Sequence, residues 1–141
     1  MGSGMIAVDT NALFRWLLAD ILPPEDAAQT AAIGTALDDE GNPVFLSTVV
    51  MAELVWLLRS RLRLDRGQIA AILQSILTDP RIVVQQAKAF VAATAAFARG
   101  GPGFVDHLTG QIALTEGART TLTFDKGAAR LSTFTLLARG G

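Results

Sequence analysis

Four carboxylates of this chain lie within or directly after apolar runs: Asp9, Glu53, Asp106 and Asp125. A carboxylate is costly to bury unless another group compensates its charge. Four such placements in one small chain indicate a shared compensator, and a divalent cation is the simplest one. The chain has no cysteine and a single histidine. A bound metal would therefore be held by oxygens, which favours Mg²⁺ or Mn²⁺ over Zn²⁺.

Each of the four acids also has a structural interpretation. Asp9 could cap a helix, Asp125 could belong to a turn or cap a helix, and Asp106 could be an acid that the helix dipole favours in a first turn. Glu53 is harder to explain in this way. Its neighbours at 49, 50, 54, 56 and 57 are apolar, so we expect it to face into the protein. The nine other acids lie in polar turns or near helix ends, and we interpret them as caps and solvated groups.

The chain that positions these acids alternates between predicted strands and helices. The predicted strands are Met5–Asp9, Val44–Leu46, Arg81–Val84, Arg119–Phe124 and Phe134–Leu137. The predicted helices are Ala12–Ala19, Pro24–Leu37, Thr48–Arg61, Arg66–Leu77, Gln85–Arg99, Phe104–Glu116 and a short Lys126–Leu131, with a solvated turn over 38–43. This order predicts an α/β fold: one domain whose central, mostly parallel sheet is flanked by helices.

In such sheets, ligands bind at the carboxyl ends of the strands. Asp9 and Asp125 end predicted strands, whereas Glu53 and Asp106 lie in the opening turns of predicted helices. We therefore expect all four carboxylates to converge on one edge of the sheet.

Composition limits the class of protein. The chain has 141 residues, of which 50% are hydrophobic and 18% charged, which is typical of one compact domain. No apolar run approaches the roughly 18 residues that a membrane span needs. We interpret residues 1–4 as an expression scar and 5–141 as the single domain, with no signal peptide after Met5. The absence of cysteine fits a reducing compartment, so we expect a cytoplasmic protein.

The order and spacing of four motifs resemble the PIN-domain ribonucleases, and most closely the VapC toxins of bacterial toxin–antitoxin pairs. The motifs are Val8-Asp9-Thr10-Asn11, Ser47-Thr48-Val49-Val50-Met51-Ala52-Glu53-Leu54-Val55-Trp56, Phe104-Val105-Asp106-His107-Leu108 and Leu122-Thr123-Phe124-Asp125-Lys126. The resemblance spans almost the whole chain from Met5. One departure is His107, where the family often has a small residue. We interpret His107 as a partly exposed or hydrogen-bonded surface histidine without a catalytic role.

The resemblance implies metal-dependent endonucleolytic cleavage of RNA, with Mg²⁺ or Mn²⁺ as cofactor. Its catalytic and metal-binding acids fall on Asp9, Glu53, Asp106 and Asp125, and Asn11 and Thr123 would orient ligands or waters. The resemblance also implies a homodimer and an antitoxin whose C-terminal segment lies across helices and blocks the site. The apolar residues around Trp16 and Trp56 would either pack in the core or receive such a partner.

RNA must then reach an acidic pocket in a chain of net charge −1. Basic side chains at the rim would hold the phosphates, and the alternative for each is an ordinary solvated helix face. The candidates are Arg15, Arg59, Arg61, Arg63, Lys126 and Arg130. Seven Phe, two Trp and no Tyr argue against extensive base stacking.

Two other functions compete with this interpretation. In a non-catalytic α/β interaction protein, the four acids would be caps and satisfied core groups, and an apolar face would bind the partner. Carboxyl groups within several Å of a common point would support the metal site, whereas scattered carboxyl groups would favour the interaction protein. A carboxylate-based phosphatase would have an Asp-x-Asp pair at a strand end, which this chain lacks. The chain also has no Gly-x-Gly-x-x-Gly motif or P-loop, so we do not expect a nucleotide cofactor.

Overall fold

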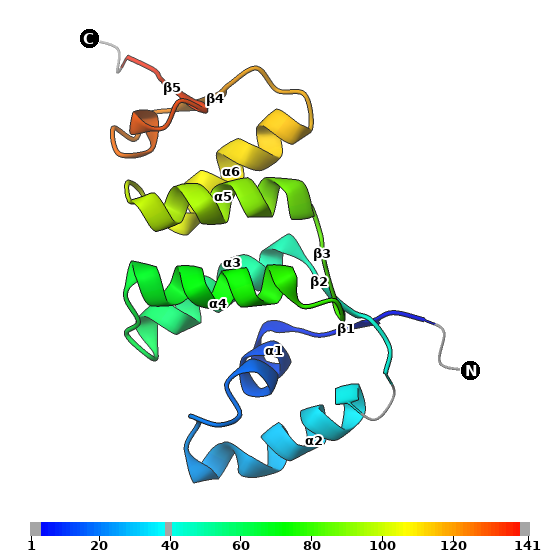
Figure 1. Cartoon of the computed structure of the whole chain (residues 1–141). Helices are drawn as coiled ribbons and strands as arrows, with labels where there is room; N and C mark the ends of the chain where they lie inside the picture. The colour runs from blue at the N-terminus through cyan, green and yellow to red at the C-terminus, as the bar shows by residue number, and fades with distance from the viewer. Residues whose placement is uncertain (1–3, 39–40, 139–141) are drawn as a thin grey trace.

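The structure is a computed structural model that describes residues 4–38 and 41–138 (Figure 1). Its strands are β1 (Ile6–Ala7), β2 (Val44–Leu46), β3 (Ile82–Val84), β4 (Thr121–Thr123) and β5 (Phe134–Leu136). Its helices are α1 (Thr10–Leu17), α2 (Ala27–Asp38), α3 (Thr48–Ser60), α4 (Arg66–Thr78), α5 (Ala87–Arg99) and α6 (Phe104–Thr115), with 3₁₀ turns η1 (Pro24–Asp26) and η2 (Ala128–Arg130). Residues 1–3 of the proposed expression scar and 39–40 of the predicted turn lie outside the described residues.

The first sheet is parallel and has the strand order β1-β2-β3. Ile6 pairs with Val44, and Val44 pairs in turn with Ile82. Parallel neighbours need long crossovers, and the helices supply them. Helices α1 and α2 connect β1 to β2, whereas α3 and α4 connect β2 to β3. The predicted α/β fold, with parallel strands flanked by helices, is confirmed.

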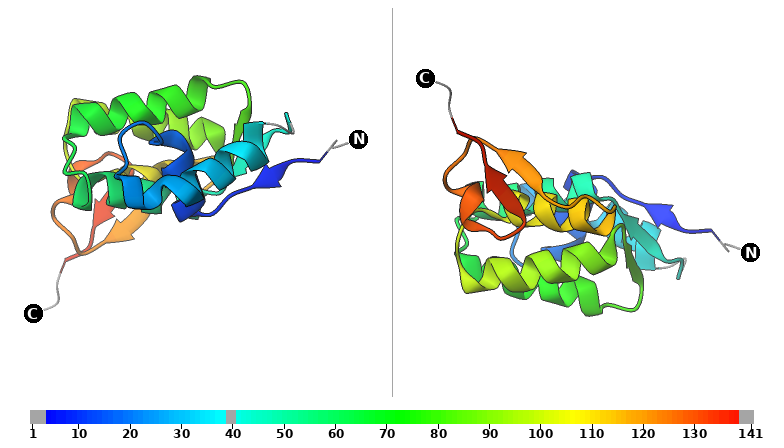
Figure 2. Two further views of the ribbon diagram at one scale, coloured as in Figure 1. Left: turned by 90° about the horizontal axis from the view of Figure 1, so that it is seen from below. Right: turned by 90° about the horizontal axis from the view of Figure 1, so that it is seen from above.

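The expectation of one central sheet needs a correction. Strands β4 and β5 form a separate parallel pair, which lies beyond α5 and α6 and far from β1 in Figures 1 and 2. This pair is held against α6 at Gly110, where Thr133 packs directly on the helix. A Cβ atom added at Gly110 would lie 2.7 Å from the Cβ atom of Thr133. Strand β1 has only two residues and pairs with β2, whereas β4 pairs with β5. The carboxyl ends of β1 and β4 therefore belong to two different sheets.

Neighbouring helices pack on one another: α1 on α2, α4 on α5 and α5 on α6, while α3 contacts α1, α4 and α6 (Figure 1). Local signals fix several of their ends. Asp65 and Gln68 form a capping box at the start of α4. The core between the helices is aromatic at one end, where Phe104 lies 5.1 Å from Phe90 and 5.6 Å from Phe97 between ring centroids. Within the described residues, no helix has the length and apolar character that crossing a membrane requires.

Candidate active site

Asp9 is the N-cap of α1. It follows β1, has an extended backbone, and accepts a hydrogen bond from the backbone N–H of Ala12 at 2.9 Å through Oδ1. The residue is exposed. One carboxylate oxygen thus satisfies the helix start, and Oδ2 remains open to solvent or a ligand.

Glu53 lies in the second turn of α3, as predicted, but it faces solvent. The expectation that it faces inward is wrong. The buried residues of α3 are Met51, Leu54, Val55 and Leu58, a stripe with helical spacing. Glu53 belongs to the opposite stripe with Val49 and Trp56, both of which are exposed although they are apolar. An apolar neighbourhood in sequence therefore does not surround Glu53 in space.

Asp106 lies in the first turn of α6 and is partly buried. Negative charge is favourable there, because the free N–H groups of a helix start carry partial positive charge. Together with Trp56 and Arg59 of α3, Asp106 lines a groove of about 200 Å³. No hydrogen bond or ion pair joins the carboxylate of Asp106 or of Glu53 to another described residue.

The turn before α6 is held by side chains from two sides. Arg66 donates hydrogen bonds to the carbonyl oxygens of Phe97, Pro102 and Gly101 at 3.0, 3.1 and 2.9 Å. Its guanidinium carbon also lies 4.4 Å from the Phe97 ring centroid. His107 is 4% exposed, and its Nε2 lies 3.1 Å from the Gly100 carbonyl oxygen. His107 is hydrogen-bonded, as one form of the prediction had it, but the expectation of a surface residue is wrong, because the ring is buried against Phe97 and fixes the turn before Asp106.

Asp125 follows β4 in a tight turn. Its Oδ1 accepts the backbone N–H of Gly127 at 2.8 Å, and its own backbone N–H donates to the Thr123 hydroxyl oxygen at 2.9 Å. Thr123, Phe124, Asp125 and Lys126 line an open hollow. The Thr123 hydroxyl group therefore supports the turn that carries Asp125, and the Oδ2 atom of Asp125 takes no part in these two hydrogen bonds.

The structure does not bring the four carboxylates to one point. Among the described residues, no group of three or more Asp, Glu, His or Cys side chains is close enough to hold a metal ion. Helix α3, which carries Glu53, contacts both α1 and α6. Asp9, Glu53 and Asp106 thus lie on helices that touch, whereas Asp125 lies with the separate β4–β5 pair. The expected convergence on one sheet edge is not seen.

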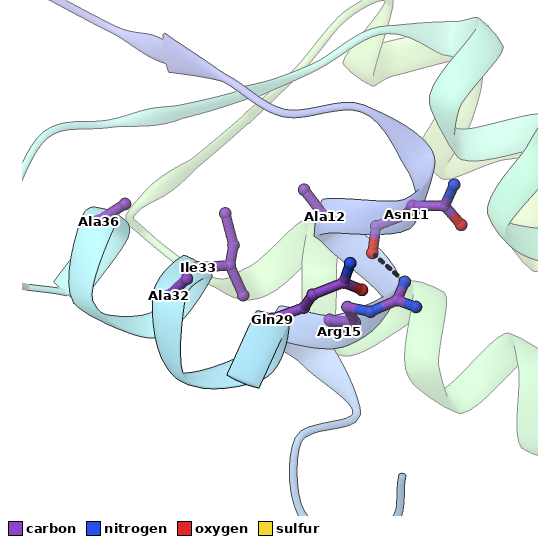
Figure 3. Close-up of a pocket in the computed structure, with 7 residues that line it drawn as sticks. All are labelled: Asn11, Ala12, Arg15, Gln29, Ala32, Ile33 and Ala36. Atoms are coloured by element: carbon purple, nitrogen blue, oxygen red, sulfur yellow. Dashed lines mark hydrogen bonds between the residues drawn. The ribbon is translucent and has the colours of Figure 1, made fainter. Parts of the chain in front are cut away.

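Asn11 and Arg15 lie in a groove of about 370 Å³ between α1 and α2 (Figure 3). Arg15 is 17% exposed. It pairs with Asp26 at 2.9 Å and donates to the Asn11 carbonyl oxygen at 3.4 Å. The rest of the lining is Ala12, Gln29, Ala32, Ile33 and Ala36. This groove is largely apolar, and Arg15 is bound within the protein rather than extended toward solvent.

The other basic candidates lie at different places. Arg59 lines the groove beside Asp106, and Lys126 lines the hollow beside Asp125. Arg61 pairs with Asp26 at 3.4 Å. Arg63 is exposed with a φ of 54°, and Arg130 is exposed in η2. Arg59 and Lys126 are therefore the two candidates beside predicted catalytic acids.

Two structural residues escaped the sequence analysis. Asp26 is 6% exposed and accepts from both Arg15 and Arg61, although its polar surroundings in the sequence indicated a solvated helix start. Arg66 binds backbone carbonyl groups. A backbone acceptor has no signature in the side-chain pattern, so no signal could have revealed this role. For Asp26, the two arginines eleven and 35 residues away were the only hint.

A comparison with protein families gives one match: the model of the PIN domain family covers residues 6–133 of the chain. No curated protein matches the chain, and no solved structure does.

Proposed function

Because the chain belongs to the PIN domain family, we propose that it is a metal-dependent endoribonuclease and the toxin of a toxin–antitoxin pair. PIN domains are typically nucleases. The observation that carries the proposal is the family match over residues 6–133, an interval that contains all four carboxylates in the order of the motifs. The choice of RNA as substrate, the metal and the toxin role come from the resemblance of those motifs.

The donor chemistry of the four acids fits a hard divalent cation. The Glu53 and Asp106 carboxylates are not engaged by other described residues, and Asp9 and Asp125 each use a single oxygen in a local hydrogen bond. We propose that these four hold Mg²⁺ or Mn²⁺, an ion that when bound lowers the pKa of a water and neutralises charge on the scissile phosphate. The arrangement in the described residues does not place three of them together.

The proposal gives the surrounding residues specific roles. Arg59 and Lys126 bind RNA phosphates beside Asp106 and Asp125. Thr123 holds the turn that presents Asp125. Asn11, which follows Asp9 by two residues, orients a ligand or a water. Arg61, Arg63 and Arg130 add positive charge at greater distance, and Arg15 supports the fold through Asp26.

The test is cleavage of a structured RNA by the purified chain with Mn²⁺. Asp9→Asn should abolish cleavage, as should a chelator. Asparagine caps helices about as well as aspartate, so the variant keeps the α1 cap and removes the charge. Asp65→Asn is the matched control, because Asp65 caps α4 and lies outside the proposed site. It should cut RNA at the wild-type rate. Full activity of Asp9→Asn would end the assignment.

The second candidate is a non-catalytic interaction domain, and one observation favours it. Asp9 and Asp125 have structural roles as a cap and a turn residue, and the four acids are not gathered. Family membership weighs against it, because PIN domains are typically nucleases. The cleavage assay separates the two functions: RNA left intact with both Mg²⁺ and Mn²⁺ would favour the interaction domain.

The toxin role has its own test. We propose that the protein acts in the cytoplasm as a homodimer and is inhibited by an antitoxin segment bound across its helices. The apolar groove between α1 and α2 supports such binding (Figure 3). Induced expression in a bacterium without the antitoxin should stop growth, and Asp9→Asn should remove that effect at equal protein levels. Growth arrest by both variants would exclude nuclease toxicity as its cause.

A further inference from the structure

Trp56 is 67% exposed, which is unusual for the largest apolar side chain. The other tryptophan is held in place: the Trp16 indole N–H donates to Asp38 at 3.3 Å, and the Arg81 guanidinium carbon lies 5.1 Å from its ring centroid. Trp56 has no comparable contact with a described residue. The protein thus presents one large aromatic face to solvent on the stripe of α3 that also carries Glu53.

The surroundings of Trp56 form a groove with one open side. It lies between α3 and the start of α6 and has a volume of about 200 Å³. An apolar cavity of about 150 Å³ holds one benzene ring, so a flat ring of that size fits. The groove is lined by Ala52, Val55, Trp56, Arg59, Gly103, Phe104, Val105 and Asp106. Its floor is apolar, and Arg59 and Asp106 are its charged groups.

The charges around the groove decide which occupant it suits. Arg59 lies about one helical turn beyond Trp56 and can bind a phosphate while a base covers the indole. Glu53 lies about one turn before it on α3, and Asp106 lines the same groove from α6. A second protein copy lying flat on Trp56 would desolvate these three charged groups together, which is costly without partners. A single nucleotide covers the ring and leaves the charged groups at the solvated edge.

We propose that Trp56 is the stacking platform for one base of a single-stranded RNA segment, with the adjoining phosphate on Arg59. The inference rests on the proposed function, since it names the form of RNA that reaches the same acids. Trp56 would select unpaired nucleotides without reading their sequence, because every base has a π-face.

The two tryptophans give the experiment its internal control. In Trp16→Phe, Trp56 is the only indole, and in Trp56→Phe, Trp16 is the only one. Each variant is titrated with a 12-nucleotide single-stranded RNA in EDTA, so that binding is followed without cleavage. We expect saturable quenching of the emission of Trp16→Phe and unchanged emission of Trp56→Phe. An abasic oligonucleotide of equal charge should bind without quenching either variant.

Affinity provides the second readout. Stacking of one base on an aromatic ring corresponds to roughly 5- to 100-fold in affinity, so Trp56→Ala should weaken RNA binding by about that factor. Trp56→Phe should lose less, and Arg59→Gln should weaken both the RNA and the abasic oligonucleotide. Because Trp56 is exposed, these variants should unfold at the wild-type urea midpoint. Equal RNA affinity of Trp56→Ala and wild type would overturn the proposal.

Two other outcomes also decide the matter. If the emission of Trp16→Phe shifts to the blue with protein concentration alone, and sedimentation shows a dimer, a second copy covers Trp56 and the proposal fails. Cleavage with Mn²⁺ is measured separately on the same RNA. Cleavage without quenching refutes the stacking platform and leaves the nuclease function standing. Quenching without cleavage supports the platform and counts against the nuclease function.

Discussion

Replacing Arg66 by methionine should destabilise the protein, because this side chain ties the start of α4 to the last turn of α5 and to the turn before α6. Its guanidinium donates to the carbonyl oxygens of Phe97, Pro102 and Gly101 and lies over the Phe97 ring. Methionine keeps most of the apolar stem and removes all the donors. The loss therefore reports the hydrogen bonds and the cation–π contact rather than a cavity.

The magnitude follows from the geometry. Three hydrogen bonds of 2.9 to 3.1 Å contribute about 1 kcal/mol each, and the cation–π contact adds about 0.5 to 1 kcal/mol. In the variant, water recovers part of this stabilisation, because the Gly101 carbonyl oxygen is exposed to solvent. We expect a net loss of about 2 to 3 kcal/mol in the free energy of unfolding. For a chain of this size, that lowers the Tm by roughly 7 to 10 °C.

The assay is urea unfolding followed by circular dichroism, with calorimetry for the Tm. Arg66→Lys should recover less than half of the loss, because one ammonium group cannot serve three separated carbonyl groups. Arg119→Met is the control. Arg119 is exposed and makes no side-chain hydrogen bond or ion pair with the described residues. Arg119→Met should therefore change the free energy of unfolding by no more than about 0.5 kcal/mol. Equal losses for Arg66→Met and Arg119→Met would refute the role assigned to Arg66.

Three further changes test the fold. Gly110→Ala should lower the free energy of unfolding by about 1 to 3 kcal/mol, because the new methyl group would clash with Thr133. This loss should exceed the gain from the better helix propensity of alanine. A higher urea midpoint would show that the β4–β5 pair does not pack there. Asp65→Ala should cost about 1 kcal/mol through loss of the α4 capping box, read as a lower urea midpoint. Arg81 lowers the pKa of Asp79 below 3.8, so this pair stabilises the protein above about pH 4 and ceases to do so as the pH falls through the folded-state pKa. Asp79→Asn should thus differ from wild type by up to about 1 kcal/mol at pH 7 and by less at pH 3; a gap that stays constant with pH would contradict this.

Several helix boundaries could be predicted from sequence because local chemistry sets them, although α1 begins at Thr10 and not at the predicted Ala12. Asp65 with Gln68 three residues later marks the start of α4, and both reciprocal hydrogen bonds are present. Gly100 ends α5 with a φ of 122°, a conformation that favours glycine. Asp106 falls in the first turn of α6, as its position after Gly103 indicated. Each of these signals acts within about four residues, so the rest of the fold hardly alters it.

The orientation of Glu53 could not be predicted, because α3 is apolar on almost every side. Its sequence offers two possible stripes, and only the packing against α1 and α6 selects the one with Met51 and Leu54. The division into two sheets likewise depends on contacts between residues that are far apart in the sequence. The sequence predicts that β4 is a strand, but its partner depends on where Thr133 meets α6. No local pattern encodes that contact.

The structural and the catalytic interpretations of Asp9 do not exclude each other. Capping α1 uses only Oδ1, and the cap fixes the carboxylate at the point where the chain leaves β1. A helix start favours negative charge, which is also what a bound cation requires of its ligand. A cap role is therefore no argument against a metal ligand, and it supplies the rigid placement that a ligand requires. The two interpretations differ in what they require of the charge: the cap needs only the hydrogen bond, whereas a metal ligand needs the negative charge. Asp9→Asn changes only the charge, and it tests the metal role at the residue where both interpretations make firm claims.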